Sequence, residues 1–377
     1  WLNDHFGVDV PWLYLALGCI VLAGIFSYFE VKLSAAILGV ALILEVLMLA
    51  TFDLGVLFSS TSNFQWESLN LLNVLTPVAA QKVGEIDIAA GAAAVGVFMA
   101  FWSWVGFEMA PNYAEESRDP KRIVPRSLYI SVIGLGLFYI ITSWCAVAAF
   151  PASEAAVAKA YSDGGNFFLH TLRDTVGTWA YEAMYFLILT SSFACGMAFH
   201  NTAARYLYSM GREGILPSGV GSTHSTHQSP HIASLLQSVL AIVWVVAFRY
   251  IYGSGDANAD AYLGVYTLFA VLGTMLLLIL QAIVSLAIIS YFNRVHPEDR
   301  HWFSTLVAPL IAFVSQVILV YLLIDNLSTF AGTGGFALWI PYIGAGVIAF
   351  GLIWGLIMKG VHPEGHARVG RMVNNAD

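Results

Sequence analysis

The sequence is poor in charge and in cysteine. Only 11% of its 377 residues are Asp, Glu, Lys or Arg, against about 25% in soluble domains, and 58% are hydrophobic. The three cysteines, Cys19, Cys145 and Cys195, all fall inside apolar runs, where they act as small hydrophobic side chains and imply no disulfide framework. The mean hydropathy is +0.74. The composition therefore argues against a soluble fold and indicates a lipid bilayer as solvent.

Patterns typical of enzymes and of nucleic-acid-binding proteins are missing as well. No H-E-x-x-H, Ser/His/Asp or dinucleotide-binding pattern occurs at a plausible membrane depth, so we expect no enzyme and no cofactor. No basic stripe suggests nucleic acid, and the net charge is −8. His224, His227 and His231 have spacings that could suit a metal ion, but Ser and Thr stand between them and no Cys or carboxylate is near. A solvated loop is the preferred interpretation there, as it is for His362 and His366, and no metal site is expected.

Long apolar runs are what the sequence has in abundance. Crossing about 30 Å of hydrocarbon takes about 20 helical residues. None of the runs has the alternation of an outer-membrane barrel strand, so each predicts a transmembrane helix. The nine runs cover residues 12–28, 33–58, 91–110, 127–150, 180–208, 232–252, 263–291, 305–324 and 337–357.

The cations predict how the helices are oriented. Short cytoplasmic loops carry an excess of Lys and Arg. If the loop after the third run is cytoplasmic, only Lys82, Lys159, Arg173 and Arg249 of the 16 cations lie outside. This orientation predicts a cytoplasmic C-terminus in the plasma (cytoplasmic) membrane. Nine crossings then place the N-terminus outside, and because the chain begins at Trp1 without a signal peptide, we expect an odd number of further spans upstream.

The third run is unusual for a transmembrane helix. It reads Phe101-Trp102-Ser103-Trp104-Val105-Gly106-Phe107-Glu108-Met109, with a glycine, two tryptophans away from the interface and a carboxylate. Glycine weakens a helix by about 1 kcal/mol relative to alanine. Membrane backbone released from helical bonds is tolerated only where it is buried in protein or lines a cavity, and such broken helices form the midplane sites of secondary transporters. The run therefore predicts a helix broken near Trp102 to Glu108.

Two stretches carry a specific resemblance. Gly106-Phe107-Glu108, Ala114-Glu115-Glu116, Asp119-Pro120, Arg122 and Pro125-Arg126 resemble the sixth span and following loop of the amino acid–polyamine–organocation permeases. The stretch from Asn201 to Tyr208, continued by 211–217, is similar to their eighth span and its loop. The resemblance covers essentially the whole chain. It implies an all-α transmembrane bundle with the leucine-transporter-like inverted-repeat fold, N-terminally incomplete, whose nine spans correspond to family spans four to twelve.

The same resemblance implies a division of the chain. Residues 1–58 would be the last two spans of the first repeat, 59–90 an external loop, and 91–291 the five spans of the second repeat. Residues 292–358 would form two C-terminal spans and 359–377 a cytoplasmic tail. In such permeases, carbonyl groups of the broken sixth span hold the substrate ammonium. This implies substrate binding by Trp102, Ser103, Trp104, Val105 and Gly106.

The side chains around the break have two interpretations each. Trp102 and Trp104 could form an aromatic wall that contacts an ammonium, or they could simply be packed or face lipid. Glu108 could act as a gate or proton acceptor, because intramembrane carboxylates are costly and often functional, or it could be a structural partner of a backbone amide or hydroxyl.

Further polar groups are weaker candidates. Glu45 lies in an apolar run with nothing nearby to neutralise it, which suits a proton relay, although an interhelical hydrogen bond is the alternative. Some relatives carry a lysine near this position in place of a sodium ion, and the glutamate departs from that pattern. Thr190 and Ser191 could line the path or join neighbouring helices. An inner loop network, or simply a topology signal, is expected from Glu115, Glu116, Arg118, Arg122 and Arg126.

These features lead to one functional expectation. The chain is interpreted as a secondary active transporter of amino acids or related small organic cations, coupled to protons, with alternating access around the broken helix. Its expected partners are the small-molecule substrate and the lipid bilayer. The alternative is a non-transporting, transporter-like membrane scaffold or amino-acid sensor.

Overall fold

The structure is a computed structural model that describes residues 6–29, 31–70, 72, 79, 81–83, 86–88, 93–150, 154–163, 166–251, 265–327 and 337–369. Nearly all regular structure in these ranges is helical. The α-helices are α2 (Trp12–Tyr28), α3 (Val31–Phe58), α5 (Ala93–Trp102), α6 (Pro120–Ala148), α7 (Glu154–Asp163), α8 (Phe167–Thr175), α9 (Thr178–Arg212), α10 (His231–Ile251), α12 (Thr267–Arg294), α13 (Ala308–Asp325), α15 (Ile340–Val361) and α16 (Pro363–Arg368). Shorter turns are the 3₁₀ elements η1 (Trp66–Leu69), η2 (Phe107–Glu116), η4 (Ser218–Gly221), η6 (Pro297–Asp299) and η8 (Ala337–Trp339), with a π-helical turn η7 (Trp302–Val307).

Every apolar run that predicts a span coincides with a helix. Among the described residues, seven helical stretches are long and apolar enough to cross a membrane, and α2 is a shorter apolar helix. The third run differs in length, because its helix α5 has only ten residues and ends at Trp102. At 35 residues, α9 begins two residues before its predicted run and ends four residues after it. The chain is therefore an integral multi-pass membrane protein with an all-α bundle, as the sequence predicts.

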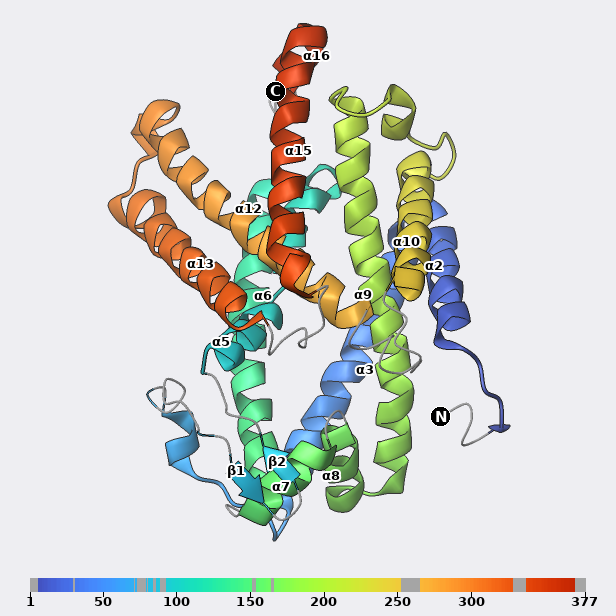
Figure 1. The fold of residues 1–377 in the computed structure, drawn as a ribbon, viewed down its shortest axis with the longest axis vertical. Coiled ribbons are helices and arrows are strands. Elements are labelled where there is room, and N and C mark those ends of the chain that lie inside the picture. Colours follow the sequence, from blue (N-terminus) through green and yellow to red (C-terminus); the bar gives the residue numbers. More distant parts are fainter. Residues whose placement is uncertain are drawn as a thin grey trace.

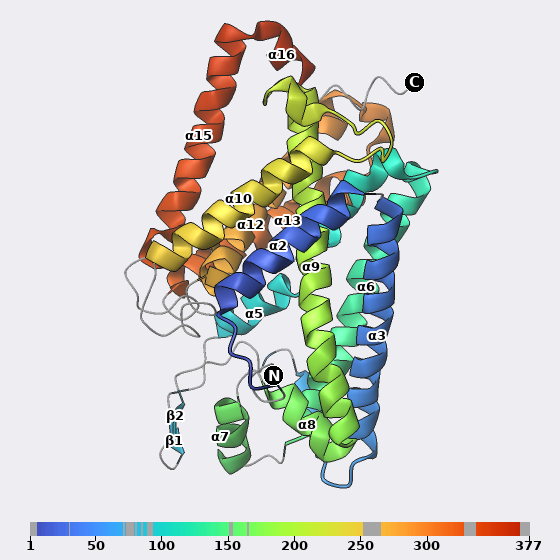
Figure 2. The ribbon, with the colours of Figure 1, turned by 90° about the vertical axis from the view of Figure 1, so that its right-hand side faces the viewer.

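Three long helices form the framework of the bundle. Helix α3 packs against both α6 and α9, and the three run along the longest axis of the molecule (Figure 1). Helix α10 lies on α2 and α9, while α12 and α13 pair with each other beside α5 and α15 (Figures 1 and 2). The break after α5 is thus placed next to α13 on one side, and η2 leads from it to α6 and α9.

The connections gather at two opposite ends. One end carries the α9–α10 and α12–α13 connections, α16 and η2, and the other carries α7, α8 and the strands (Figure 2). The turn after α2 is tied to the first end, because the Tyr28 hydroxyl and the His224 ring are 3.0 Å apart and the Ser229 hydroxyl donates to the Tyr28 carbonyl at 2.6 Å. The cation-rich connections therefore share one end, which is the grouping that the orientation argument assumes.

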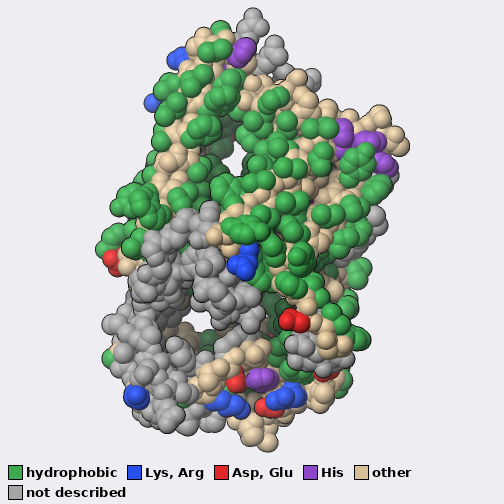
Figure 3. All heavy atoms as spheres, turned by 45° about the vertical axis from the view of Figure 1, so that its right-hand side comes forward, with side chains coloured by type: hydrophobic (Ala, Val, Ile, Leu, Met, Phe, Trp, Pro, Cys, Tyr) green, Lys and Arg blue, Asp and Glu red, His purple; other side chains and the backbone are tan. Residues whose placement is uncertain are grey.

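Apolar side chains cover the middle of the molecule. Figure 3 shows a broad band of them, with most charged side chains on that face gathered toward the two ends. This pattern suits a hydrocarbon environment, which needs no polar cover. Inside, one apolar cluster lies where α3, α6, α8 and α9 meet, and another is centred on α12. The first consists of Met48, Phe52, Val56, Cys145, Ala146, Ala148, Leu172 and Ala180.

The region between α3 and α5 differs from expectation. A helix-like piece is predicted from Leu69 to Leu75, but most of it lies outside the described residues, and η1 ends at Leu69. Two short strands, β1 (Gln81–Val83) and β2 (Ile86–Ile88), pair antiparallel with Lys82 opposite Asp87. Their β-branched residues favour strands over helix. A second helix-like piece, predicted from Phe167 to Val176, is confirmed as α8. The proposed division into repeats stays a prediction.

Candidate functional site

The broken span is the centre of the candidate site. Helix α5 ends at Trp102, the backbone turns through residues 103–106, and η2 begins at Phe107. Gly106 stands at φ 122° and ψ −24°, in a region that side chains with a Cβ rarely adopt. The glycine at this position thus allows the backbone to change direction between the turn after α5 and the start of η2. The break predicted near Trp102 to Glu108 is present, while its role in binding stays a prediction.

Carbonyl groups of the break are partly used within the protein. The Trp102 carbonyl accepts a hydrogen bond from the Val105 N–H at 3.0 Å, and the Trp104 carbonyl accepts from the Phe107 N–H at 3.3 Å. The Tyr139 hydroxyl of α6 donates to the Ser103 carbonyl at 2.9 Å. A carbonyl oxygen has two lone pairs, so each of these groups can accept a second donor. These hydrogen bonds hold the turn in shape, and binding of an ammonium group there stays a prediction.

Trp102 and Ser103 lie at the end of α5. The half-buried Trp102 ring lies 5.6 Å from the Tyr266 ring, which comes just before α12, and together they form an aromatic surface next to the break. The Ser103 hydroxyl donates to the Met99 carbonyl at 3.0 Å. Trp102 therefore stands where an aromatic wall is expected, whereas the Ser103 side chain bonds to its own helix.

Trp104 packs against α6. Its indole N–H donates to the Val132 carbonyl at 3.1 Å, and its ring meets the Tyr139 ring edge-on at 5.4 Å. The ring also lies over Gly136, where an added Cβ would come within 3.1 Å of it. This is the packed arrangement given above as the alternative for Trp104. Gating by Trp104 stays a prediction.

The Glu108 side chain turns back onto the break. Its Oε2 accepts a hydrogen bond from the Gly106 N–H at 2.9 Å. The carboxylate thereby satisfies a backbone amide that the broken helix leaves free. The structure shows the structural role given for Glu108, and a role in gating or proton transfer stays a prediction.

The other candidates lie apart from the break. Glu45 is half-buried on α3 and interacts electrostatically with the Cys195 thiol of α9. On α9, the Thr190 hydroxyl donates to the Leu187 carbonyl at 3.0 Å, and Ser191 is half-buried. Within the described part of the chain, neither of two surface hollows brings Glu45, Thr190 or Ser191 together with residues 102–106. A relay by Glu45 and a path along α9 stay predictions.

The inner loop shows one strong contact that sequence reasoning did not anticipate. Arg205 of α9 is 7% exposed, and its guanidinium lies 4.1 Å from the centroid of the Tyr113 ring in η2. Its Nη1 also donates to the Asn201 carbonyl at 3.0 Å. The segment that follows the break is thus held against α9. Of the predicted network, Arg118, Arg122 and Arg126 are exposed, and the side chains of Glu115 and Glu116 lie outside the described residues.

Sequence reasoning also missed Asp53. This residue lies on α3, and its Oδ2 accepts a hydrogen bond from the Thr142 hydroxyl of α6 at 2.9 Å. An aspartate inside the apolar run 33–58 was the signal that could have found it. Asp53 therefore joins Glu45, Glu108 and Glu182 as a carboxyl group within the predicted spans.

The histidines of the α9–α10 connection form a ring cluster. The His224 ring lies 4.7 Å from that of His227 and 5.0 Å from that of His231, and Tyr28 contacts all three (Figure 3). His224 Nδ1 accepts from the N–H groups of Thr226 and His227, each at 3.2 Å. Desolvation and then the neighbouring His227 and His231 lower the pKa of His224. The rings thus organise a connection that the sequence presents as a solvated loop.

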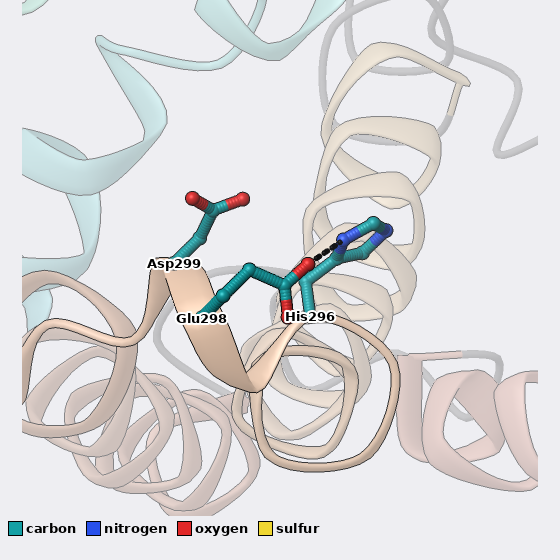
Figure 4. Close-up of side chains that lie close together, drawn as sticks. All are labelled: His296, Glu298 and Asp299. Atoms are coloured by element: carbon teal, nitrogen blue, oxygen red, sulfur yellow. Dashed lines mark hydrogen bonds and ion pairs between the residues drawn. The ribbon is translucent and has the colours of Figure 1, made fainter.

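One other group has the spacing of metal ligands. His296, Glu298 and Asp299 lie between α12 and α13, with possible ligand atoms within 4.8 Å of one another. Figure 4 shows Glu298 turned toward His296, with Nδ1 and Oε1 2.9 Å apart, and Asp299 turned away. The hydrogen bond to its own backbone and then the His296 side chain lower the pKa of Glu298. Both carboxylates are exposed, and such groups are common without an ion, so this cluster does not identify a metal centre.

Two hollows open on the surface of the described structure. One, of about 450 Å³, lies between the α9–η4 connection and the end of α15, and the other, of about 390 Å³, lies between α3 and α8. Residues of the break line neither of them. The candidate site is therefore defined by the broken backbone and its aromatic neighbours, not by either hollow.

Comparison with known proteins supports the same interpretation as the broken helix. The model of the amino acid permease family matches residues 2–355. The chain belongs to this family. The family is one of transporters, so the match agrees with the expectation that the permease is not an enzyme, and with the resemblance to amino acid–polyamine–organocation permeases.

Individual relatives are more distant. The permease is 27% identical over 158 residues to the low-affinity putrescine importer PlaP of Escherichia coli K12, a match covering 39% of the chain and 32% of the importer. It is 20% identical over 148 residues to the branched-chain amino acid permease BcaP of Bacillus subtilis, covering 37% and 30%, and 25% identical over 148 residues to amino acid transporter protein 6 of Caenorhabditis elegans, covering 39% and 27%. The matched part of the chain spans about a third of the length of these curated relatives.

Proposed function

We propose that the protein is a proton-coupled secondary transporter of amino acids or small organic amines. Substrate binds at the broken span and gains access alternately from the two sides of the membrane. One observation carries the proposal: in a chain of the amino acid permease family, α5 stops at Trp102 and the backbone turns through Gly106 partway along an apolar run. Backbone of this kind is tolerated there only where it is buried or lines a cavity.

The chemistry of the break favours a cationic substrate group. Carbonyl oxygens from Trp102 to Trp104 carry partial negative charge, and each accepts one hydrogen bond described above, which leaves a second lone pair for another donor. The Trp102 and Tyr266 rings offer a surface to which an ammonium is attracted by their π-electrons. Both the amino group of an amino acid and that of a polyamine meet these requirements. The relatives named for putrescine and for branched-chain amino acids fall within this range.

The orientation of the protein is part of the proposal. The end that carries η2, the α9–α10 connection and α16 faces the cytoplasm, and the protein lies in the plasma membrane. The cation distribution supports this assignment. A thiol-reactive, membrane-impermeant reagent tests it on single cysteines introduced at exposed Ser218 and Lys159, in a background without the natural cysteines. Labelling of Lys159→Cys but not Ser218→Cys in intact cells is expected, and the reverse pattern would invert the orientation.

Counterflow tests transport itself. Proteoliposomes loaded with unlabelled amino acid or putrescine should take up the labelled compound without any ion gradient. A pH gradient, acidic outside, should then drive accumulation. Binding of substrate without exchange would instead identify a sensor or scaffold. Exchange that ignores the pH gradient would retain the transporter and remove the proton.

A further inference from the structure

Asp53 is held at the seam between two membrane helices. It lies on α3, five residues before the helix ends at Phe58, or about 8 Å along the axis. Oδ2 accepts from the Thr142 hydroxyl at 2.9 Å, and the Cys145 thiol, one turn further along α6, is a second hydrogen-bonding neighbour. Thr142 is 7% exposed and Cys145 is 4% exposed. The contact is thus closed to bulk solvent on the α6 side.

The second oxygen of Asp53 has no partner. Within the described residues, Oδ1 is buried and accepts no hydrogen bond. The apolar cluster to which Cys145 belongs also contains Phe52, Val56 and Leu172, which are at most 1% exposed. Burial of an unpaired oxygen penalises the charged carboxylate more than the neutral carboxyl group. The site therefore holds an oxygen that is suited to bind a proton.

Among the described residues, no cation pairs with Asp53 in a way that would favour its charged form. Among the described groups, Cys145 is the only titratable one that acts on it. On α8, His170 pairs with Asp163 at 3.4 Å, and Arg173 pairs with Asp174 at 3.7 Å while facing the Tyr181 ring of α9. Near this end, α9 also carries Glu182, and α2 has no Asp, Glu, Lys, Arg or His. Asp53 therefore has no ion-pair partner among the described residues of the packed helices.

We propose that Asp53 is a proton-binding residue of the transporter, with the proton taken up at Oδ1 while Oδ2 stays bonded to Thr142. This inference rests on the proposed proton-coupled function. Asp53 lies near the end of α3, a helix that packs against α8, and the proposed orientation places the end of the molecule that carries α8 outside. A proton that enters from outside converts the carboxylate to a carboxylic acid. The same proton leaves when the site opens inward, so that Asp53 returns to the carboxylate.

The position of Asp53 gives this proton a structural effect. Helices α3 and α6 meet through Asp53 and Thr142, and η2, which follows the break, packs on α6. A charged Asp53 accepts a strong hydrogen bond from Thr142, and a protonated Asp53 accepts a weaker one. Protonation also removes the desolvation cost of burying the charge. Protonation therefore favours close packing of α3 on α6. The seam is one helix away from the broken span, with which it shares α6.

The test compares Asp53→Asn with Asp325→Asn in proteoliposomes. Asp325 is an exposed carboxylate at the end of α13 and serves as the matched control. Asparagine mimics the neutral carboxyl group, so Asp53→Asn should keep counterflow and lose accumulation driven by the pH gradient. Asp325→Asn should keep both. In infrared difference spectra between acidic and alkaline buffer, one protonated-carboxyl band should be absent from Asp53→Asn and present in Asp325→Asn.

A second variant guards against misfolding. Thr142→Val keeps the shape of the side chain and removes the donor to the carboxylate. Loss of a hydrogen bond to a charged group should move the pH of half-maximal uptake upward by about one unit. Accumulation by Asp53→Asn equal to that of the wild type, or an unchanged carboxyl band, would overturn the inference while leaving the transporter intact. A wild type that exchanges substrate but ignores the pH gradient would overturn proton coupling and the role of Asp53 together, and a wild type without counterflow would overturn the proposed transport itself.

Discussion

Replacing Gly106 by alanine should separate backbone strain from packing. Nothing lies within 4 Å of the position that a Cβ at Gly106 would occupy, so the methyl group itself meets no obstacle. The cost comes from φ 122°, which an alanine rarely adopts, and such a residue is destabilised by about 1–3 kcal/mol. We expect Gly106→Ala to lower the unfolding midpoint by a few degrees. We also expect it to weaken substrate binding, because relief of the strain changes the direction of the turn.

Gly96 in α5 provides the matched control. It too has nothing within 4 Å of an added Cβ, but it lies inside a helix, where alanine is favoured over glycine by about 1 kcal/mol. Gly96→Ala should therefore leave the unfolding midpoint unchanged or raise it. Intrinsic tryptophan fluorescence during heating in detergent and counterflow in proteoliposomes measure the two effects. Equal behaviour of the two variants would refute the argument that φ at Gly106 sustains the break.

Three further outcomes are expected. Glu108→Gln should abolish proton-coupled uptake with membrane insertion intact, because glutamine still accepts from the Gly106 N–H but binds no proton; accumulation at the wild-type level would remove Glu108 from the mechanism. Tyr113→Leu should destabilise the protein by about 1–2 kcal/mol, because it removes the ring that faces buried Arg205. Tyr113→Phe keeps the ring and should unfold like the wild type. Equal unfolding midpoints for the two variants would contradict this. The lowered pKa of His224 favours its neutral form, so the stability that this ring gives its loop is present above about pH 6.5 and is lost as pH falls through the lowered value. Hydrogen-exchange protection of residues 222–230 should therefore fall in acid, and protection independent of pH would contradict it.

The membrane helices were largely predictable because length and hydropathy are properties of single segments. Runs such as 180–208 and 305–324 needed only a count of apolar residues to be identified. The ends were less predictable. Helix α9 continues to Arg212, where Gly211 lies so close to the Gly221 backbone that an added Cβ would be 2.4 Å from its nitrogen. That closure depends on a loop folding back, which hydropathy does not describe.

The candidate site was predictable only in its backbone. Gly106 beside Phe107 and Glu108 indicated the break, because a glycine and a carboxylate are local exceptions in an apolar run. Which way the side chains turn depends on neighbours distant in sequence. Trp104 meets α6 through Val132 and Tyr139, and no pattern around residue 104 specifies that contact. Asp53 could have been noticed from its apolar run alone, but its partner, Thr142, is 89 residues away and no local pattern identifies it.

The length of α9 limits how this end of the molecule can move. Its 35 residues extend about 52 Å, more than the roughly 40–45 Å of a bilayer with its headgroups. The segment contains no proline to act as a hinge. A continuous helix without a hinge transmits displacement from one end to the other. A displacement of Thr178, next to α8, therefore also displaces Arg212 and the short turn η4. Tilting of α9 would therefore move the histidine-bearing loop and the contact between Arg205 and Tyr113 together.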